Sequence, residues 1–324
     1  MNLASRATRA ILQQMISEGF TMKFFLSRRT YNASKKKFTN NFAALTRYVM
    51  IDAGPGGAGA GKIISRGDWL AQVVARAQSD EVVVFVHGFN TPQASMLERL
   101  GKIEQGLQNN GYQGAVVAFD WPSDGILTAY DPDLRDARKS APFLVPDGIL
   151  PLLDQGLSVH VLAHSMGTYL TLRAFAGEGD TLGANPWTVG QVLFVAADTE
   201  AEAVRKGAWG GLVLERRCER FTNYYSTADR VLAVSGGFVH GGRDRAGHVG
   251  LPDAKPDNSV DMYTTVQFRR HVPPARQSDI IVSHTWLYDD AGFYRDAAMT
   301  VAGRADAGMP TRRNTNVGDR ALLT

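Results

Sequence analysis

The sequence predicts a doubly wound α/β fold, in which helices cover both faces of a mainly parallel sheet. Two observations lead to this prediction. Short apolar runs alternate with segments of helical periodicity from residue 68 to residue 302. The chain has 324 residues, of which 44% are hydrophobic, and this is enough for one large core. Because parallel strands end at one edge of such a sheet, we expect a ligand site at that edge.

The composition restricts the class of protein. The formal net charge is only +3, so no nucleic-acid partner is indicated. The one cysteine, Cys218, cannot form an intrachain disulfide, and we interpret it as a small buried residue in a reducing compartment. No apolar run is long enough to span a membrane. Residues 1–21 have an amphipathic helical pattern without the apolar core of a signal peptide. We therefore expect an N-terminal appendage, a cytoplasmic protein, and Met22 as an alternative start to Met1.

The first elements are expected to be antiparallel edge strands over 22–26 and 45–52. Next, residues 56–62 fit the pattern G-x-x-x-x-G-K of a phosphate-binding loop. However, Ile63 stands where that loop needs a Ser or Thr to bind magnesium. We therefore interpret the glycine-rich segment as a hairpin loop, followed by a helix over 68–77.

The strongest signal for a buried strand begins at Glu81 and ends in the turn His87-Gly88-Phe89-Asn90. The glycine lets the chain turn tightly, so that the amide of Phe89 can point inward. A helix over 92–110 and a strand over 114–120 follow. Residues 121–148 form a long mixed segment with several aromatic and proline residues. A connection of this length is usually functional, so we expect a lid or a pocket wall.

The central stretch of the chain is residues 158–172. Apolar side chains alternate up to His164, as in a buried strand, and helical spacing begins after Ser165. Small residues, Ala163 and Gly167, stand two positions before and two positions after this serine. A strand that turns directly into a helix at a serine is a nucleophile elbow, whose sharp turn leaves no room for large side chains. Ser165 could instead be an ordinary helix cap, and partners elsewhere in the chain must decide.

The alternation of strands and helices continues to the C-terminus. We predict strands over 191–198, 220–226 and 258–268, a glycine-rich loop over 236–247, a helix over 292–302 and an extended tail over 305–324. The folded domain is then 22–304. Asp198 and Asp229 end two of these strands, and His284 lies in the loop before the last helix. All three are therefore expected at the same edge of the sheet as Ser165.

Five short motifs give the chain a family resemblance. They read V-F-V-H-G-F-N, W-P-S, A-H-S-M-G, Y-x-S-x-x-D-x and a late His followed by an aromatic residue, at 84–90, 121–123, 163–167, 224–230 and 284–286. With these motifs the chain resembles the α/β-hydrolase superfamily, in particular a bacterial branch of esterase-like or lipase-like serine hydrolases of uncharacterised function. The similarity covers roughly residues 80–300.

The order Ser…Asp…His is that of the α/β-hydrolase triad. A serine hydroxyl is a weak nucleophile until an imidazole accepts its proton, and the imidazole needs a carboxylate to hold its tautomer. The resemblance therefore implies Ser165 as nucleophile, His284 as base and Asp229 as acid. The oxyanion is expected between the backbone amides of Phe89 and Met166.

Three further residues are expected to contact the substrate: Asn90, Trp121 and His164. Trp121 is included because the loop that it begins leaves the sheet at its ligand-binding edge and is long and aromatic. His164 also follows the elbow strand, where it would pack beside the nucleophile. Asp198 competes with Asp229 for the role of acid. We favour Asp229, because Asp198 can be explained as the N-cap of a helix, whereas glycines at 236 and 237 follow Asp229 too soon for an equally good helix.

The predicted function is a serine hydrolase that cleaves a small-molecule carboxylic ester through an acyl-enzyme. No cofactor is implied, and no metal is predicted, because His240, Asp244 and His248 have no fourth ligand at the spacing of a closed site. An acyltransferase or thioesterase would use the same triad. A binding or scaffold protein on an inactivated hydrolase fold is the alternative from another class. The sequence gives no indication of oligomeric state.

Overall fold

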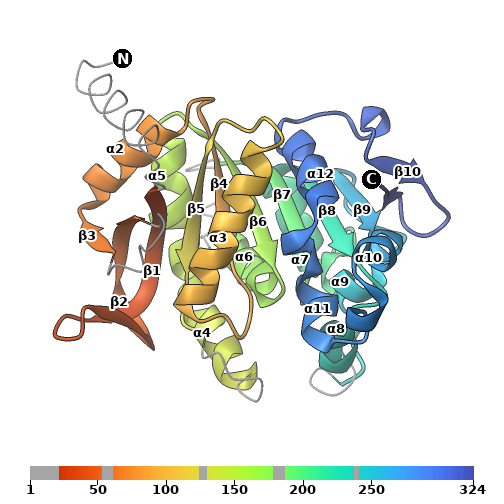
Figure 1. The fold of residues 1–324 in the computed structure, drawn as a ribbon, viewed down its shortest axis with the longest axis horizontal. Coiled ribbons are helices and arrows are strands. Elements are labelled where there is room, and N and C mark those ends of the chain that lie inside the picture. Colours follow the sequence, from red (N-terminus) through yellow and green to blue (C-terminus); the bar gives the residue numbers. More distant parts are fainter. Residues whose placement is uncertain (1–21, 53–60, 124–129, 178–186, 237–240) are drawn as a thin grey trace.

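The chain folds around one large sheet that is parallel at its centre. The computed structural model describes residues 22–52, 61–123, 130–177, 187–236 and 241–324, so the expected appendage at 1–21 lies outside the described residues. Eleven described strands form the sheet in the order β10-β11-β9-β8-β7-β6-β4-β5-β1-β2-β3 (Figure 1). No described helix is long and apolar enough to cross a membrane.

The strand bounds agree closely with the sequence prediction in the centre of the sheet and less well at its edges. The strands are β1 (Met22–Asn32), β2 (Lys37–Asp52), β3 (Lys62–Ile64), β4 (Glu81–Val86), β5 (Ala115–Asp120), β6 (Ser158–His164), β7 (Val189–Val195), β8 (Cys218–Tyr225), β9 (Ser259–Tyr263), β10 (Arg312–Asn314) and β11 (Arg320–Leu322).

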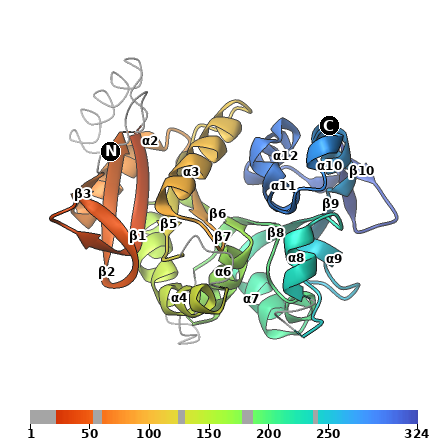
Figure 2. The same cartoon turned by 60° about the horizontal axis from the view of Figure 1, so that its bottom comes forward.

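The helices lie on both faces of the sheet, as predicted. The α-helices are α2 (Arg66–Arg76), α3 (Gln93–Gln108), α4 (Tyr130–Phe143), α5 (Leu150–Leu153), α6 (Met166–Gly177), α7 (Trp209–Arg217), α8 (Arg230–Val234), α9 (Ala246–Val249), α10 (Thr265–His271), α11 (Ile280–Thr285) and α12 (Ala291–Val301). Apolar residues of α2, α4, α5, α6 and α7 pack into one core, and those of α3, α10 and α12 into the other. Figure 2 shows the two helical layers above and below the sheet.

The central strands are apolar because both of their faces are buried. In β4, Val82, Val84 and Val86 face one core, while Val83 and Phe85 face the other. A strand that is buried on both faces reads as a continuous apolar run. This strand pairs in parallel with both β5 and β6, which brings the turn after Val86 next to the end of β6.

The first strand differs from the expectation. β1 is antiparallel to β2, as predicted, but on its other side it runs parallel to β5, so it belongs to the parallel part of the sheet. The glycine-rich segment connects β2 to β3, which are antiparallel neighbours; residues 53–60 of it lie outside the described part of the chain. Lys62 begins a strand rather than a helix, which argues against a phosphate-binding loop.

The prediction of a strand over 258–268 is wrong in its second half. β9 ends at Tyr263, and residues from Thr265 onward form α10. Thr264 ends the strand because its backbone N–H and its hydroxyl both donate to the carbonyl of Tyr225, at 2.9 and 2.8 Å. Phe268, in this helix, is buried in the core. The apolar residues of the segment therefore follow a helical period after Thr264 rather than the alternation of a strand.

The C-terminal residues also differ from the expected extended tail. β11 pairs in parallel with β9 and antiparallel with β10, so the segment continues the sheet. The buried Arg312 guanidinium donates to the carboxylate of Asp296 in α12 at 2.8 and 3.0 Å. This ion pair attaches the last residues to the domain, although strands of three residues give almost no signal in the sequence.

Candidate active site

Ser165 lies in a sharp turn between β6 and α6. Its backbone has a φ of 53°, in the left-handed region that non-glycine residues rarely adopt. A Cβ atom at Gly167 would lie 2.5 Å from the carbonyl oxygens of Val86 and His87, and one at Gly88 would lie 2.7 Å from the Cβ of Ser165. The glycines are therefore required by the close approach of the two turns, and the expected elbow geometry is present.

His284 and Asp229 form a buried pair close to this turn. The Nδ1 atom of His284 lies 2.7 Å from Oδ2 of Asp229, and both side chains are nearly inaccessible to solvent. The other carboxylate oxygen accepts from the backbone N–H of Leu232 at 3.0 Å, so Asp229 caps α8 as well. His284 lies in α11 rather than in the predicted loop. The Nε2 atom of His284 has no hydrogen-bond partner in the described part of the chain.

His164 connects the serine turn to His284. Its Nε2 lies 3.1 Å from the backbone carbonyl of His284, and the two imidazole rings have centroids 4.7 Å apart. Because a carbonyl only accepts, this nitrogen carries the proton and donates. The ring of His164 also contacts Tyr288 at 5.0 Å. Only 2% of His164 is exposed, so the expected contact with substrate is not seen, and its position suits holding α11 beside Ser165 instead.

Burial lowers the pKa of His164 well below the usual value, and the nearby imidazole of His284 lowers it further. The folded protein therefore keeps this ring neutral, whereas the unfolded chain binds a proton below a pH of about 6.5. Stability that depends on the neutral ring is complete above that pH and is lost as the pH falls.

We therefore expect the destabilisation caused by His164→Gln to shrink between pH 7.5 and pH 5, by up to about 1.4 kcal/mol for each pH unit below 6.5. Glutamine can still donate to the carbonyl of His284. Urea unfolding of both proteins at the two pH values measures the difference. A destabilisation that stays constant, or grows on acidification, would contradict the assignment of a neutral ring.

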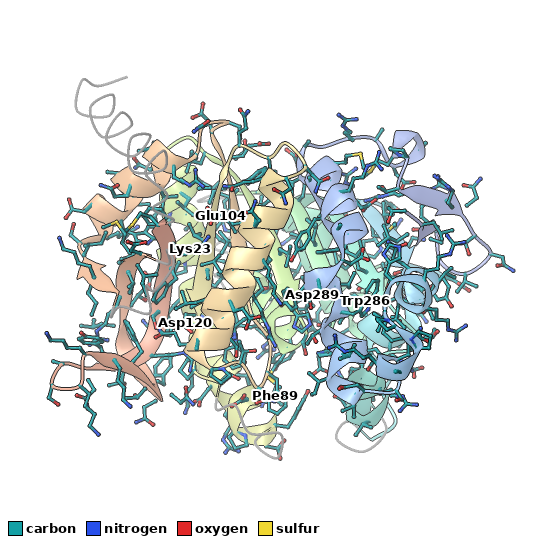
Figure 3. The ribbon with its side chains drawn as sticks, in the orientation of Figure 1. Lys23, Phe89, Glu104, Asp120, Trp286 and Asp289 are labelled. Atoms are coloured by element: carbon teal, nitrogen blue, oxygen red, sulfur yellow. The ribbon has the colours of Figure 1, made fainter. Side chains whose placement is uncertain are left out.

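The two backbone amides that are expected to bind the oxyanion lie at the start of α6 and in the turn after β4. Met166 is the first residue of α6, a position whose N–H has no partner within its helix. The amide of Phe89 follows Gly88, which touches Ser165, and no described residue accepts a hydrogen bond from it. Asn90 has a φ of 54° and its N–H lies 3.3 Å from Oδ2 of Asp133. Figure 3 shows Phe89 at the end of the molecule where α4 and α8 also lie (compare Figure 1).

Trp121 supports this turn from inside. Its indole N–H donates to the carbonyl of His87 at 2.8 Å, and the two rings stack 5.1 Å apart. The backbone N–H of Trp121 donates to Nε2 of His87 at 3.1 Å. The tryptophan is completely buried, so the expected contact with substrate is not available in this structure. Trp121 and His87 can be buried together because their polar atoms form hydrogen bonds with one another.

A buried ion pair beneath the turn was missed in the sequence. The Nε atom of Arg29 donates to Asp120 at 2.7 Å, and another nitrogen of the same guanidinium donates to the carbonyl of Thr91 at 2.8 Å. Asp120 also accepts from Ser27 and Gln93. The pair therefore ties β1 and β5 to the turn after β4. The available signal was the presence of charged residues in two largely buried strands, Arg29 in the second half of β1 and Asp120 at the end of β5.

We expect Arg29→Met to destabilise the fold by about 3–5 kcal/mol, because it leaves the carboxylate of Asp120 buried without its cation. The double variant Arg29→Met with Asp120→Asn removes that charge and should recover part of the loss. Thermal or urea unfolding of the three proteins measures the coupling. Additive losses in the double variant would show that the two side chains do not act as a pair.

Asp198 occupies a different environment from Asp229. Its carboxylate accepts from the hydroxyls of Tyr130 at 2.7 Å and Ser235 at 3.1 Å, and it lies 3.5 Å from Nε of Arg245. The expected role of Asp198 as a helix cap is wrong: the following 3₁₀ turn, Ala201–Val204, begins after Glu200. None of these three partners is a histidine.

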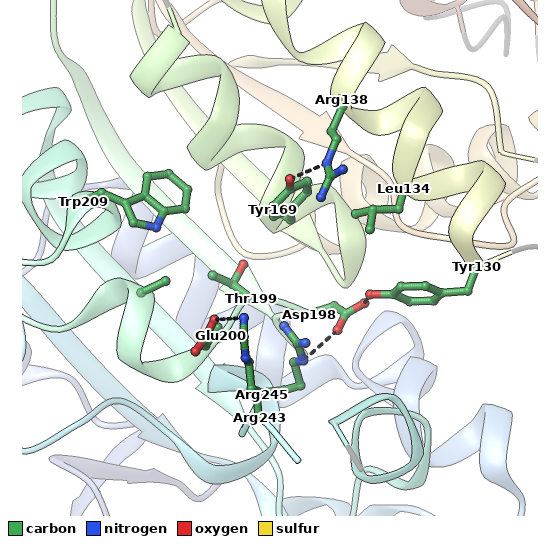
Figure 4. A pocket seen from close by; sticks show the side chains of 11 residues that line it. Tyr130, Leu134, Arg138, Tyr169, Asp198, Thr199, Glu200, Trp209, Arg243 and Arg245 are labelled. Atoms are coloured by element: carbon green, nitrogen blue, oxygen red, sulfur yellow. Dashed lines mark hydrogen bonds and ion pairs between the residues drawn. The ribbon is translucent and has the colours of Figure 1, made fainter. Parts of the chain in front are cut away.

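A small pocket of about 240 Å³ lies beside the serine turn (Figure 4). Its walls come from α4, α6, α7, the residues after β7 and the segment before α9. The backbone N–H of Asp198, in the wall, donates to the carbonyl of Ser165 at 3.2 Å. Tyr130, in the opposite wall, contacts the ring of Phe89 at 5.6 Å. Of the described residues in the predicted pocket wall at 121–148, only those in the first turns of α4 line this pocket; Ala141 and Leu144 belong to the core.

No group of three or more His, Cys, Asp or Glu side chains in the described ranges is arranged to hold a metal ion. His240, one of the three residues considered for such a site, lies outside those ranges. Cys218 is buried at the start of β8, as expected, and burial raises the pKa of its thiol above the usual value.

Comparison with known proteins agrees with the α/β fold. The model of the family described as "Alpha/beta hydrolase of unknown function (DUF900)" matches residues 63–285, which is more than half of the chain. The match spans Ser165, Asp229 and, at its end, His284. A search of curated proteins found no match.

Proposed function

Since the chain belongs to the DUF900 family of α/β hydrolases, we propose that it is a serine hydrolase that cleaves carboxylic esters through an acyl-enzyme. One observation carries the proposal: His284 contacts Asp229 at 2.7 Å, and its backbone carbonyl is bonded by His164, the residue before a serine held in a left-handed turn. A helix cap needs neither the strained backbone nor a buried His–Asp pair nearby. The proposal assigns Ser165 as nucleophile, His284 as base and Asp229 as acid.

The protonation states follow from the hydrogen bonds. Asp229, when ionised, accepts a hydrogen bond from the protonated Nδ1 of His284, so that Nε2 is left with a lone pair. This nitrogen takes the proton of the serine hydroxyl while Oγ bonds to the ester carbonyl carbon. The negative oxygen that forms would be stabilised by the amides of Phe89 and Met166, with the start of α6 adding a favourable dipole.

The remaining steps balance the proton and the leaving group. As the tetrahedral intermediate collapses, the bond between the carbonyl carbon and the alcohol oxygen breaks, and His284 gives its proton to the departing alcohol. Water then repeats the sequence against the acyl-enzyme, which releases the acid and restores the serine. An acyltransferase would use another alcohol, thiol or amine in place of this water.

A fluorophosphonate probe tests the proposal, because it forms a covalent bond only with an activated serine. We expect labelling of the wild-type protein at Ser165, identified by mass spectrometry, and none after Ser165→Ala. Release of 4-nitrophenol from esters of graded chain length then measures turnover. A folded protein that is neither labelled nor active would favour the alternative of a binding protein on a hydrolase fold.

A further inference from the structure

The pocket beside Ser165 contains a buried cation with incomplete hydrogen bonding. Only 5% of Arg245 is exposed, and its Nε atom has no hydrogen-bond partner. The carboxylate of Asp198 lies 3.5 Å from Nε and also accepts hydrogen bonds from Tyr130 and Ser235. A guanidinium has five N–H donors, and none of those of Arg245 forms a hydrogen bond with a described residue. A buried donor without an acceptor is costly, so this group is suited to an acceptor from outside.

The backbone holds Arg245 in place without using its side chain. Arg245 forms a bridge with Glu200, and the next residue, Ala246, donates its N–H to the carbonyl of Thr199 at 2.9 Å. Asn223 in turn donates to the carbonyl of Ala246 at 3.0 Å. These bonds fix the backbone of Arg245, and burial encloses its guanidinium in the pocket wall, where Figure 4 shows it beside Asp198. A preorganised donor loses less conformational freedom on binding than a mobile one.

The other charges of the pocket favour an anion. Three of its described lining residues are arginines, and two are carboxylates. Arg243 pairs with Glu200 at 3.3 Å, and Asp198 is the neighbour of Arg245. The third cation, Arg138, donates to the hydroxyl of Tyr169 at 2.8 Å and has no carboxylate partner among the described residues. One positive charge is therefore left uncompensated in the wall.

The size of the pocket limits its ligand. Its volume of about 240 Å³ is below the range of about 300–1,000 Å³ that is usual for drug-sized ligands. A long acyl chain does not fit such a space, and a buried cation would disfavour one. A short chain that ends in a charged group matches both the volume and the guanidinium.

We propose that this pocket binds an anionic group of the substrate, a carboxylate or a phosphate, through Arg245, so that the hydrolase acts on short esters that carry a negative charge. This inference rests on the proposed function, because it names the substrate class of the same site. A guanidinium pairs with either anion through two parallel hydrogen bonds. Asp198, in the pocket wall, donates its backbone N–H to the carbonyl of Ser165 at 3.2 Å, so the pocket wall is joined directly to the serine turn.

Binding tests the pocket independently of turnover. Glutarate, inorganic phosphate and neutral glutaramide are titrated by calorimetry into the Ser165→Ala variant. We expect one or both anions to bind, glutaramide not to bind, and Arg245→Gln to weaken the anion by about 10- to 100-fold, as for loss of a charged hydrogen bond. Arg245→Lys should weaken it less, because it keeps the charge but loses the fork. Comparing the two anions identifies which is preferred.

A matched arginine provides the control. Arg205 pairs with Glu202 on the surface and is not part of the pocket wall. Arg205→Gln should therefore leave anion binding unchanged. Melting temperatures of all variants separate loss of binding from loss of fold. If Arg245→Gln does not fold, the Arg245→Lys variant and the wild-type contrast between glutarate and glutaramide still decide.

Kinetics tests the substrate class on both sides of the ester. The acyl-side pair is the mono-4-nitrophenyl ester of glutarate against 4-nitrophenyl valerate, and the alcohol-side pair is the butanoate ester of 3-hydroxypropanoate against propyl butanoate. For the wild type we expect kcat/KM to be at least about tenfold higher for the charged member of one pair. This preference for the charged ester should be lost in Arg245→Gln.

The outcomes are distinguishable. Labelling of Ser165 and turnover of neutral esters, without anion binding or preference for a charged ester, would overturn the anion pocket and leave the serine hydrolase intact. Absence of labelling and of all turnover would overturn the proposed function, while the calorimetry would still decide whether the pocket binds anions.

Discussion

Replacing Ser165 by alanine is expected to lower kcat for activated esters by about 10⁶, as removal of the nucleophile does in a serine protease. Under the proposed mechanism the Ser165 hydroxyl forms the covalent bond, and no other hydroxyl is held in the same turn. The residual rate would come from the oxyanion amides and binding alone. Release of 4-nitrophenol from purified protein, followed over hours, measures it.

The fold should survive this substitution. The hydroxyl of Ser165 makes no hydrogen bond within the described part of the chain, whereas its backbone N–H and carbonyl bond to Val195 and Asp198. Alanine keeps the Cβ atom and those backbone bonds. We expect a melting temperature close to that of the wild type, with the difference in unfolding free energy below about 1 kcal/mol.

Ser158→Ala is the matched control, because Ser158 is the exposed first residue of the same strand. It should retain wild-type turnover. If Ser165→Ala also kept turnover within tenfold of the wild type, the serine would be only a structural residue of the turn, and the acyl-enzyme mechanism would be wrong.

The central part of the fold could be predicted because its signals are local. In β4 and β6, burial on both faces produces apolar runs within one short segment. The elbow is also local, since the backbone of Ser165 and the contacts of Gly167 depend on residues next to them and on one adjacent turn. Sequence spacing therefore carries this information.

The supporting contacts could not be predicted, because they join segments that are distant in the chain. Arg29 binds a carboxylate 91 residues away, and Trp121 binds a carbonyl 34 residues away. Such partners depend on the order of strands in the sheet. The sequence predicts Trp121 at the substrate pocket because its loop is aromatic and leaves the sheet at the ligand-binding edge. In the structure its indole N–H donates to the carbonyl of His87 instead.

The glycines at 236 and 237 also gave an incomplete picture of Asp229, because they were expected to leave no room for a good helix after it. Asp229 does cap a helix, since Leu232 donates to it at 3.0 Å, and the helix is only five residues long. A cap and a partner for histidine are compatible, because a carboxylate has two oxygens and each oxygen binds a different donor here. The distinction between Asp229 and Asp198 therefore rests on their neighbours rather than on helix quality.

Asp229→Asn is expected to lower kcat by about 10⁴, as the same change does in a serine protease. An asparagine oxygen can still accept from Leu232, so α8 should remain capped. Its amide nitrogen would then face Nδ1 of His284, and an amide nitrogen cannot accept a hydrogen bond from a protonated Nδ1. The imidazole of His284 would then carry its proton on Nε2, the nitrogen that must accept the serine proton, and it would lack a negative charge to stabilise the imidazolium.

The control for this variant is Asp279→Asn. Asp279 caps α11, the helix of His284, by accepting from the amides of Ile281 and Val282 at 2.9 and 3.0 Å. Loss of its charge perturbs the same helix, but it does not touch the imidazole. We expect a loss of stability of up to about 1 kcal/mol and turnover close to that of the wild type.

Comparison with Asp198→Asn decides the assignment of the acid. The carboxylate of Asp198 accepts from Tyr130 and Ser235, so its change should alter the pocket and cost stability of about 1–3 kcal/mol, without changing the tautomer of His284. Turnover of a neutral ester and the melting temperature are measured for both variants. If Asp198→Asn, in a well-folded protein, lost about 10⁴ in kcat while Asp229→Asn kept its activity, the acid would be on β7 and the contact of Asp229 with His284 would be structural.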